Sequence, residues 1–309
     1  IHPGGEAMRI LDRHGVVRMD EDDEGDGARP EVDRGQLRDL LLNSLPADTV
    51  RWGEKITGVR PLEGGRHEVT TDDGDAFTTD LLIGADGAWS KVRPLVSAAT
   101  PAYSGVSFVE LDLRDAEMRH PTSAAVVGGG FLMALGPKRG FLAHREPDGS
   151  LHVYAALKVP EEELSAIDFA DTDAAKAAVL AHFDGWHDSL RSLVKDADGA
   201  LTPRRIHALP VDHSWGRTPG VTLLGDAAHV MSPFAGEGAN LAMLDGAELG
   251  QFLAAHPEDA EAALAAYEQA LFPRSKASAA DSADNLDLSF RHDSPQGLLD
   301  RFASYHGAS

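Results

Sequence analysis

The stretch VTLLGDAAHVMSPFAGEGAN, residues 221–240, has the pattern of a ligand-binding turn between a strand and a helix. Its apolar start, Val221–Leu224, predicts a short buried strand that leads directly into Gly225 and Asp226. Glycines in the loop that follows let a ligand approach the backbone, and free N–H groups at a helix start attract anions. A carboxylate at the end of a strand can accept hydrogen bonds from sugar-type hydroxyls. An ordinary strand–turn–helix, with Asp226 as a cap, would show the same spacing.

A second stretch, DLLIGADGAWSKVR at residues 80–93, has a similar pattern. An apolar strand ends at Gly84, and Asp86 and Gly87 follow at the turn. The polar and basic residues at 90–93 predict a helix start, which would suit a phosphate group. A plain strand-to-helix turn is the alternative interpretation.

A helix is predicted at residues 34–45, where leucines recur at helical spacing and Asp33 suits the N-cap position. Arg34 at the start of this helix could pair with a pyrophosphate, and Arg38 lies one turn further on the same face. Both arginines could instead be solvated surface residues.

The chain is strongly acidic: its 309 residues include 28 Lys and Arg against 50 Asp and Glu, a net charge of −22. This charge argues against nucleic acid and against an anionic membrane surface as partners, because both favour a cationic protein surface. The length corresponds to about two domains of roughly 150 residues. The absence of cysteine excludes disulfides, iron–sulfur clusters, thiolate zinc sites and a cysteine nucleophile.

Motifs that the sequence lacks disfavour further function classes. The 14 histidines form no HxxxH or HExxH pattern, so we expect no metal site. No G-x-S-x-G elbow is present, which argues against a serine hydrolase. No apolar run reaches the roughly 18 residues of a membrane span, and no signal-peptide pattern opens the chain, so we expect a cytoplasmic protein.

The expected elements change in kind along the chain, from mixed α/β to mostly β, and then to one strand followed by long helices. Strands are expected at 8–12 and 16–19 (a hairpin), 49–60, 66–71, 76–83, 104–113, 124–135, 140–144, 151–159, 204–209 and 220–224. Helices are expected at 34–45, 172–183, 188–195, 239–256, 257–285 and 295–305. The middle of the chain would form its own antiparallel sheet layer, interrupting one nucleotide-type domain built from the flanks.

The motifs resemble those of the class A flavoprotein monooxygenases, the para-hydroxybenzoate hydroxylase-like superfamily. Gly225-Asp226, with the Pro-x-x-Gly-x-Gly at 233–238, is similar to the second FAD fingerprint of that family. Asp86-Gly87 is similar to its DG motif, which serves FAD and NAD(P)H. Arg34 and Arg38 match the helix that follows the family's first βαβ unit.

Within the superfamily, the chain most resembles the tetracycline-inactivating monooxygenases. That resemblance is carried by residues 30–45, 48–52, 90–93 and 225–236. No GxGxxG turn occurs, so we expect the family's first βαβ unit, with its pyrophosphate cradle, to be missing from the chain.

The resemblance implies an α/β fold in which an FAD-binding Rossmann-like domain is interrupted by a mostly antiparallel β-sheet substrate domain. The FAD-binding domain, incomplete at its N-terminus, would be discontinuous and comprise residues 1–99 and 211–285. The substrate domain would comprise residues 100–210, and a C-terminal helix would occupy 286–309.

The implied activity is that of an FAD-dependent monooxygenase that hydroxylates an aromatic or enolic small molecule, with tetracycline-like molecules as one option. NADPH or NADH would reduce FAD, and oxygen transfer would proceed through a flavin C4a-hydroperoxide. A small-molecule substrate is the expected partner, and we expect a monomer or a weak homodimer.

The resemblance also assigns candidate site residues. Cofactor contacts are expected from Arg34, Arg38, Asp86, Gly87, Gly225, Asp226, Pro233, Gly236, Gly238, Ala239 and Asn240. Asp226 would bind the ribityl chain, and backbone N–H groups at 236–240 would hold the pyrimidine edge of the flavin. Substrate contacts are expected from Glu110, Phe131, Leu142, His152, Pro233 and Phe234. No side chain need be a nucleophile, although His152 could assist a substrate proton.

Two positions differ from the tetracycline enzymes, which carry Gln where this chain has Glu110 and Arg where it has Phe131. A more apolar or differently charged aromatic substrate therefore suits the sequence as well as tetracycline does. A protein that binds an aromatic ligand with little or no flavin, or an inactive relic, is the alternative from another class. A flavin dehydrogenase or halogenase is a third possibility, although no Trp-rich halogenase motif is present.

Overall fold

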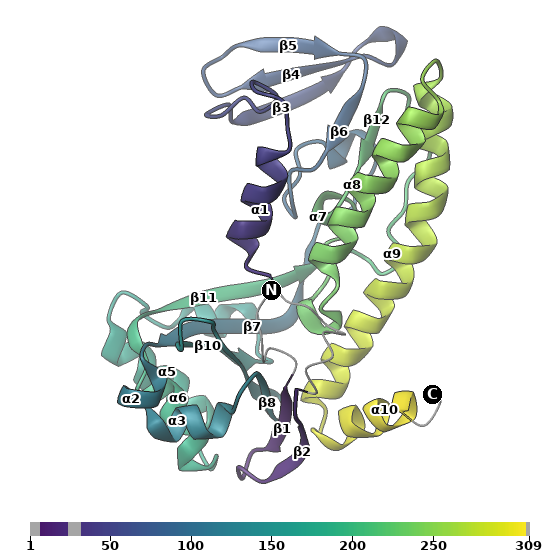
Figure 1. Ribbon diagram of the computed structural model, residues 1–309. Helices are drawn as coiled ribbons and strands as arrows, with labels where there is room; N and C mark the ends of the chain where they lie inside the picture. The colour runs from purple at the N-terminus through teal and green to yellow at the C-terminus, as the bar shows by residue number, and fades with distance from the viewer. Residues whose placement is uncertain (1–6, 24–31, 307–309) are drawn as a thin grey trace. The chain divides into compact units, whose positions relative to one another are not determined.

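The fold combines sheets and helices in two units, each of which joins distant segments of the chain (Figure 1). The computed structural model describes residues 7–23 and 32–306. Unit 1 is built from Ile1–Pro46, Gly105–Ile206 and Asp287–Ser309, and unit 2 from Ala47–Ser104 and His207–Leu286.

A seven-stranded sheet forms the centre of unit 1. Its strands are, in spatial order, β11 (Asp198–Ala208), β7 (Ala102–Leu113), β10 (Leu151–Leu157), β9 (Arg139–Arg145), β8 (Phe131–Gly136), β1 (Met8–Asp12) and β2 (Val17–Glu21). The pairs β1–β2, β8–β9, β9–β10 and β10–β7 are antiparallel, whereas β1 runs parallel to β8. The central strands are therefore joined by local antiparallel pairing, as the sequence predicts for this region.

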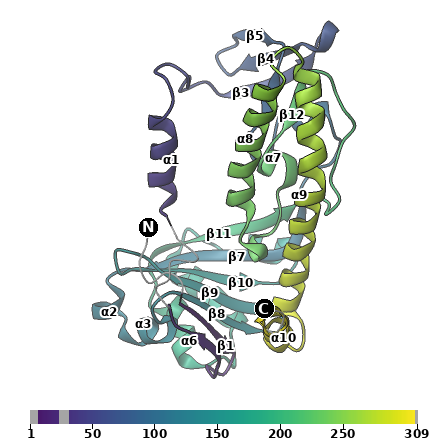
Figure 2. The ribbon, with the colours of Figure 1, turned by 45° about the vertical axis from the view of Figure 1, so that its right-hand side comes forward.

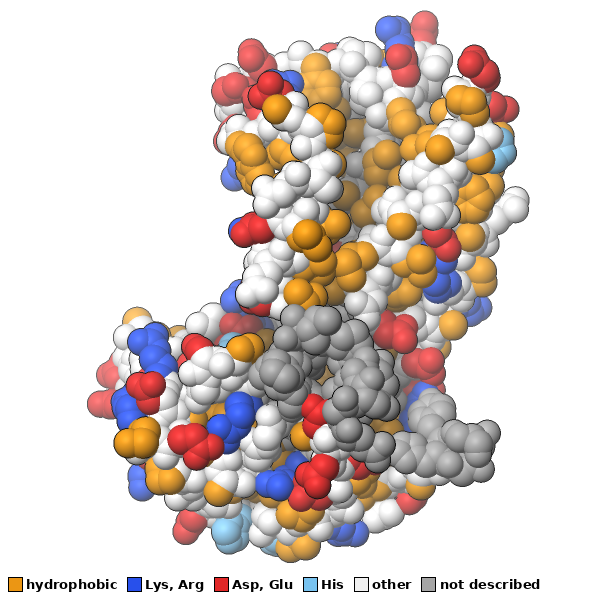
Figure 3. Space-filling view, in the orientation of Figure 1, with side chains coloured by type: hydrophobic (Ala, Val, Ile, Leu, Met, Phe, Trp, Pro, Cys, Tyr) orange, Lys and Arg blue, Asp and Glu red, His pale blue; other side chains and the backbone are white. Residues whose placement is uncertain are grey.

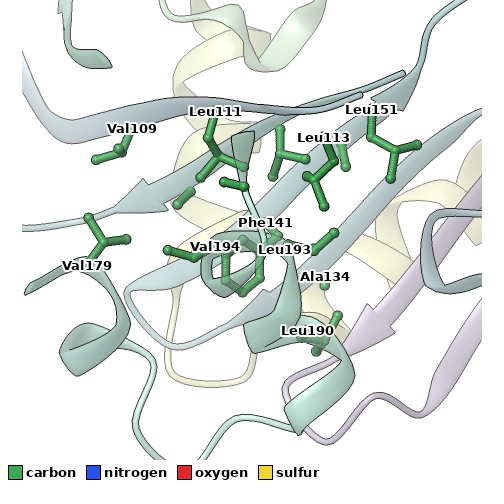
Figure 4. Close-up of a cluster of buried hydrophobic side chains, with 14 of the residues drawn as sticks. Val109, Leu111, Leu113, Ala134, Phe141, Leu151, Val179, Leu190, Leu193 and Val194 are labelled. Atoms are coloured by element: carbon green, nitrogen blue, oxygen red, sulfur yellow. The ribbon is translucent and has the colours of Figure 1, made fainter. Parts of the chain in front are cut away.

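One face of this sheet is packed against short helices. They are α2 (Ala116–Arg119), α3 (Pro121–Val127), α4 (Glu161–Ser165), α5 (Thr172–His182) and α6 (Asp188–Lys195). Val109, Leu111 and Leu113 of β7 share a buried hydrophobic cluster with Leu193 and Val194 of α6 (Figure 4). Because side chains alternate along a strand, the residues between these lie on the opposite face, called the outer face below.

Unit 2 contains two small sheets. One is the parallel pair of β6 (Leu82–Gly84) and β12 (Val221–Leu223), and the other is the antiparallel sheet of β3 (Ile56–Pro61), β4 (His67–Thr71) and β5 (Ala76–Thr79). The helices α8 (Gly238–Ala255) and α9 (Ala260–Phe290) run side by side in both views (Figures 1 and 2). Leu249, Leu264 and Tyr267 of these helices form a buried core with Val221 and Leu223.

Most predicted elements are confirmed within a few residues. The hairpin at 8–19 is β1–β2, and the helix predicted at 34–45 is α1 (Arg34–Asn43). The Asp33 carboxylate caps α1 by accepting a hydrogen bond from the Gln36 N–H at 2.9 Å. The last predicted helix is α10 (Gln296–His306). Among the described residues, none of the helices combines the length and the apolar character that crossing a bilayer requires.

The strand predicted at 124–135 is wrong in its first half. Pro121 is the first residue of α3, which buries Ser123, Ala124 and Val127. Gly128 then ends the helix at a φ of 81°, and β8 begins at Phe131. A short apolar run fits a buried helix as well as a buried strand, and proline at the first helical position decides for the helix here.

The expected domain map differs from the structure at the start of the chain. Residues 1–99 were assigned as one segment of the FAD-binding domain, whereas Ile1–Pro46 belongs to the unit of the large sheet. The reason is a non-local strand pair: Met8–Asp12 pairs residue by residue with Phe131–Leu135, and Ile10 is fully buried. Asp287–Ser309, expected as a separate C-terminal helix, also joins unit 1.

Candidate functional site

Two loops of unit 2 leave the same end of a parallel strand pair. In the register of β6 and β12, Leu223 lies opposite Gly84, and the Leu224 N–H donates to the Gly84 carbonyl at 2.9 Å. Asp86 follows one strand by two residues and Asp226 follows the other by three, and both side chains are exposed. The structure thus brings together the two stretches that the sequence singles out, at the carboxyl ends of their strands.

Arg93 joins these two loops from within. Its side chain is only 3% exposed, and its guanidinium donates to the carbonyls of Ala227 (2.8 Å), Ala88 (2.8 Å) and Asp226 (3.1 Å). Burial lowers the pKa of Arg93, an effect that the nearby carboxylates of Asp86 and Asp226 oppose. Arg93 therefore connects the two loops through hydrogen bonds from its buried guanidinium.

The helix predicted to start at residues 90–93 is wrong. The segment is a turn followed by a single 3-10 turn, Arg93–Leu95. The Ser90 hydroxyl oxygen accepts hydrogen bonds from the N–H groups of Val92 (3.1 Å) and Arg93 (2.9 Å). Because these donors are satisfied internally, the segment lacks the free N–H groups that a phosphate would need.

The turn after β12 requires glycine. Gly225 has φ 58° and ψ −143°, and Asp226 begins the short helix α7 (Asp226–His229). A Cβ atom at Gly225 would lie 3.1 Å from the Cβ of Ala242 on α8, so the turn packs closely on that helix. A side chain at this position would meet both backbone strain and a close contact.

The N-terminus of α8 is open to a ligand. Its N-cap residue, Glu237, makes no side-chain capping hydrogen bond, and the Glu237 carbonyl accepts a hydrogen bond from the Leu241 N–H at 2.9 Å. Among residues 7–23 and 32–306, a Cβ atom built on Gly236 or Gly238 would meet nothing within 4 Å. The first-turn N–H groups and the positive end of the helix dipole are therefore available beside open space.

The outer face of the sheet in unit 1 carries two rows of side chains that cross its strands. From β8 to β7, the first row is Phe131, His144, His152 and Asp112. The second row is Met133, Leu142, Tyr154 and Glu110. The side chains of β8 are apolar, those of β10 and β7 are polar or aromatic, and the face therefore has an apolar side and a polar side.

The polar side of this face is organised by a histidine–carboxylate hydrogen bond and an arginine–carboxylate ion pair. His152 Nδ1 lies 2.7 Å from Asp112 Oδ1, and Arg204 Nε donates to Glu110 Oε2 at 2.9 Å. The Tyr154 ring meets the His152 ring edge-on, with centroids 4.7 Å apart. Burial raises the pKa of Tyr154, and the Glu110 charge raises it further, so the phenol stays a neutral donor at neutral pH.

Comparison with known proteins assigns the chain to a family. Residues 47–282 match the family described as "FAD binding domain". The chain is 30% identical over 348 residues to the monooxygenase asqM of Emericella nidulans, covering 92% of this chain and 78% of that protein. It is 31% identical to the monooxygenase penA of Penicillium thymicola, covering 91% and 77%. The chain belongs to the FAD-dependent monooxygenases.

Solved structures agree on the fold. Klebsiella pneumoniae HpxO in complex with FAD and uric acid has a TM-score of 0.78 at 23% identity, covering 98% of this chain and 76% of that one. The tetracycline destructase Tet(51) has a TM-score of 0.62 at 19% identity, covering 91% and 72%. The superfamily resemblance is thus confirmed. This monooxygenase is an enzyme whose cofactor is FAD, with NAD(P)H as the reductant typical of the family.

The residues of unit 2 fit FAD by their chemistry. Uncapped N–H groups at the start of α8 suit the carbonyl edge of a flavin, which gains negative charge on reduction. Within the described residues, the Asp226 carboxylate accepts no hydrogen bond, so it can accept one from a hydroxyl of the cofactor. The open space at Gly236 and Gly238 allows a planar group to approach the backbone.

The remaining predicted residues fall on both units. Pro233 and Phe234 lie in a 3-10 turn, Pro233–Ala235, within unit 2. Arg34 and Arg38 lie on α1 in unit 1, where Arg38 pairs with Asp39 at 2.9 Å. The charge of Arg34 acts on Tyr154, whose pKa it lowers against the larger effect of burial. The assigned roles of these residues stay predictions.

Sequence reasoning missed several residues of the outer face. Glu110, Phe131, Leu142 and His152 were predicted, and the structure places all four on this face. The missed members are Asp112, Met133, His144 and Tyr154. A signal for each of them was available, since each lies two residues from a predicted residue on the same strand.

A separate hollow of about 660 Å³ lies in unit 1 beside β2 and α10. Its lining includes Arg18, Met19, Gln296 and Leu299. None of the residues that the sequence assigns to cofactor or substrate lines this hollow. The candidate cofactor residues in the loops of unit 2 and the candidate substrate residues on the outer face of unit 1 thus lie apart from this hollow.

Proposed function

We propose that this monooxygenase hydroxylates a planar aromatic or enolic small molecule that carries an acidic hydroxyl or N–H group. The observation that carries the proposal is the two-sided outer face of the sheet in unit 1. Phe131, which is half-buried, and Met133 and Leu142, which are buried, make one side of this face apolar and suited to a ring. His152 and Tyr154 offer hydrogen-bonding groups to its polar edge.

His152 is the candidate acceptor for a substrate proton. A carboxylate only accepts hydrogen bonds, so the contact of 2.7 Å requires that His152 Nδ1 carries the proton and donates it to Asp112. In the neutral imidazole, the lone pair then lies on Nε2, which can accept a proton from a hydroxyl. Removing that proton makes an aromatic or enolic carbon more electron-rich, which favours attack on an electrophilic oxygen.

For the cofactor, we propose the contacts that the family resemblance implies. When bound, FAD supplies the chemistry of oxygen activation. Asp226 would accept a hydrogen bond from the ribityl chain, and the N–H groups of residues 236–240 would hold the flavin ring. Asp86 and Arg34 would bind the segment between the ribityl chain and the pyrophosphate. The other proposed contacts are Arg38, Gly87, Gly225 and Pro233.

The proposed substrate class is wider than the tetracyclines. Glu110 pairs with Arg204, so this edge of the face presents a balanced ion pair. Phe131 lies 6.4 Å from the His144 ring and adds apolar surface. Relatives carry names as different as urate hydroxylase and zeaxanthin epoxidase, so the family alone does not fix a substrate. We propose a compact aromatic substrate, with tetracycline-like molecules as the second candidates to assay.

The first experiment is to incubate the purified chain with FAD, desalt it and record the visible spectrum. Retained flavin bands, shifted from those of free FAD, support the cofactor site. NADPH and NADH consumption is then measured with a panel of hydroxylated aromatics and with tetracycline. Stimulation by a phenol but not by its methyl ether supports the proposed substrate class. Tight binding of an aromatic ligand without flavin or NADPH oxidation favours the alternative, a flavin-free binding protein.

A further inference from the structure

A buried carboxylate lies directly behind the Gly225 turn. Asp245, on α8, is fully buried. Its Oδ2 atom accepts a hydrogen bond from the Gly225 N–H at 2.9 Å and lies 2.6 Å from His229 Nε2. Its Oδ1 atom accepts a hydrogen bond from Arg274 Nη2 of α9 at 3.0 Å. One side chain thus contacts the turn, the short helix after it and a long helix of unit 2.

We propose that Asp245 is a positioning residue that holds the Gly225–Asp226 turn in its FAD-binding conformation. The turn needs such support, because Gly225 has a backbone conformation that few residues adopt and packs closely on Ala242. Asp245 also lies on the helix whose N-terminus ends the loop, at Gly238. The Asp245 carboxylate therefore connects Gly225, where the loop begins, to α8, the helix that starts where the loop ends.

The hydrogen bonds keep this carboxylate charged. Burial by itself would raise the pKa of Asp245, but the hydrogen bonds from His229, the Gly225 N–H and Arg274 outweigh burial, and the pKa is lowered. A carboxylate can accept all three donors, whereas a protonated acid would have to turn one O–H toward a donor. The geometry of the turn therefore depends on the charged form.

The His229 side chain belongs to the hydrogen-bond network around Asp245. Because the Asp245 carboxylate only accepts, His229 Nε2 carries a proton and donates it in this hydrogen bond. Nδ1 is buried and has no hydrogen-bond partner in the part of the chain that the structure describes. The side chain is 5% exposed. Its role is to support Asp245, and it is not placed to accept a substrate proton.

The test compares Asp245→Asn with Glu248→Gln. Glu248 accepts from Arg274 Nη1 at 2.8 Å and has no contact with the turn, so its variant removes an ion pair of the same arginine and leaves Gly225 untouched. Amide hydrogen exchange without FAD is measured first. We expect faster exchange in the peptide containing Gly225 for D245N and no change for E248Q. This readout needs no bound flavin, so it separates the inference from the proposed substrate and from activity.

FAD binding is measured next, by titration of flavin fluorescence. D245N is expected to raise the Kd for FAD about tenfold or more, since hydrogen bonds to a charged group are lost, and E248Q should stay within about twofold. If D245N does not fold, His229→Gln and His229→Leu replace it, because Gln keeps an N–H donor and Leu does not. FAD binding by H229Q but not by H229L supports the proposal. Unchanged exchange at Gly225 in D245N, or equal loss of FAD in E248Q, overturns it.

Discussion

The Gly225 turn in unit 2 and the outer face of the sheet in unit 1 are held by different kinds of contact. The turn is fixed by buried hydrogen bonds: Arg93 donates to the Ala227 carbonyl, and Asp245 accepts from the Gly225 N–H. The outer face is organised by side-chain pairs near the surface, such as His152 with Asp112, whose side chains are 31% and 53% exposed. A backbone site suits a cofactor that is the same throughout a family, whereas exchangeable side chains suit a substrate that differs between members.

Hydrophobic side chains gather over α1 and over α8 on the face shown in Figure 3. Leu40 and Leu41 of α1 are 68% and 51% exposed, and Met243 and Leu244 of α8 are 41% and 42% exposed. These residues lie beside the parts of each unit that carry candidate cofactor contacts, Arg38 on α1 and Gly238 on α8. The hydrogen bonds that hold the Gly225 turn thus lie inside unit 2. The helix α8, in contrast, keeps apolar side chains exposed on its surface.

The largest expected effect is on the turn. Gly225→Val places a β-branched residue at a positive φ and against Ala242, so FAD binding should weaken on the order of 100-fold. Flavin absorbance after desalting and a fluorescence titration measure the loss. Gly246→Ala is the matched control, because a Cβ at that helical position meets nothing within 4 Å and alanine favours a helix. Equal FAD binding by G225V and the native chain would show that the turn does not form the cofactor site.

The second-largest effect is expected on the outer face, where it tests the role proposed for His152. His152→Gln should lower kcat/KM for a hydroxylated aromatic about 100-fold, because it removes the proposed proton acceptor, while the Kd for FAD stays unchanged. Asp112→Asn should give a smaller loss, since His152 is then less firmly oriented. His182→Gln, on α5 and away from this face, is the control. A fall in FAD affinity with H152Q, or full activity, would contradict the proposed division of roles.

A smaller effect is expected at Asp226. Asp226→Ala removes one charged acceptor for a cofactor hydroxyl and should weaken FAD binding about tenfold. Asp80→Ala is a suitable control, because Asp80 is exposed and precedes β6 at the opposite end from Asp86. Full FAD retention by D226A would remove the role assigned to this carboxylate.

The sequence predicts the turn better than the face because the turn is local. Val221–Leu224, Gly225 and the glycines before α8 lie within twenty residues, and each has a direct conformational reason. The rows of the outer face depend on strand register: Phe131, His144, His152 and Asp112 come from four strands. Register is set by pairing between distant segments, so single residues were predicted and the rows were not.

Two further features of the structure could not be predicted from local sequence patterns. The pairing of Met8–Asp12 with β8 joins segments about 120 residues apart in sequence, and nothing in a hairpin pattern indicates which third strand it will join. The role of Asp245 was missed because an Asp inside a predicted helix is typical of a solvated face. Its burial follows only from the packing of α8 against the turn and Arg274.

The smallest expected effect concerns a side-chain network in unit 1. Asp198 accepts hydrogen bonds from the Arg119 guanidinium at 2.6 and 2.9 Å and from the Arg114 N–H at 2.8 Å. These contacts hold the pKa of Asp198 well below its usual range. Because the pKa is depressed in the folded state, the stabilisation is present above the ordinary aspartate pKa of about 4 and is lost as the pH falls below it.

Asp198→Asn should therefore lower the Tm by a few degrees at pH 7, and the difference from the native chain should shrink as the pH falls below about 4. Thermal melts across pH 3–8 measure both curves. FAD binding should not change, because Asp198 contacts neither the Gly225 turn nor α8. A Tm difference that is the same at every pH would mean that the charge of the Asp198 carboxylate does not stabilise unit 1, in contrast to the charged Asp245 site.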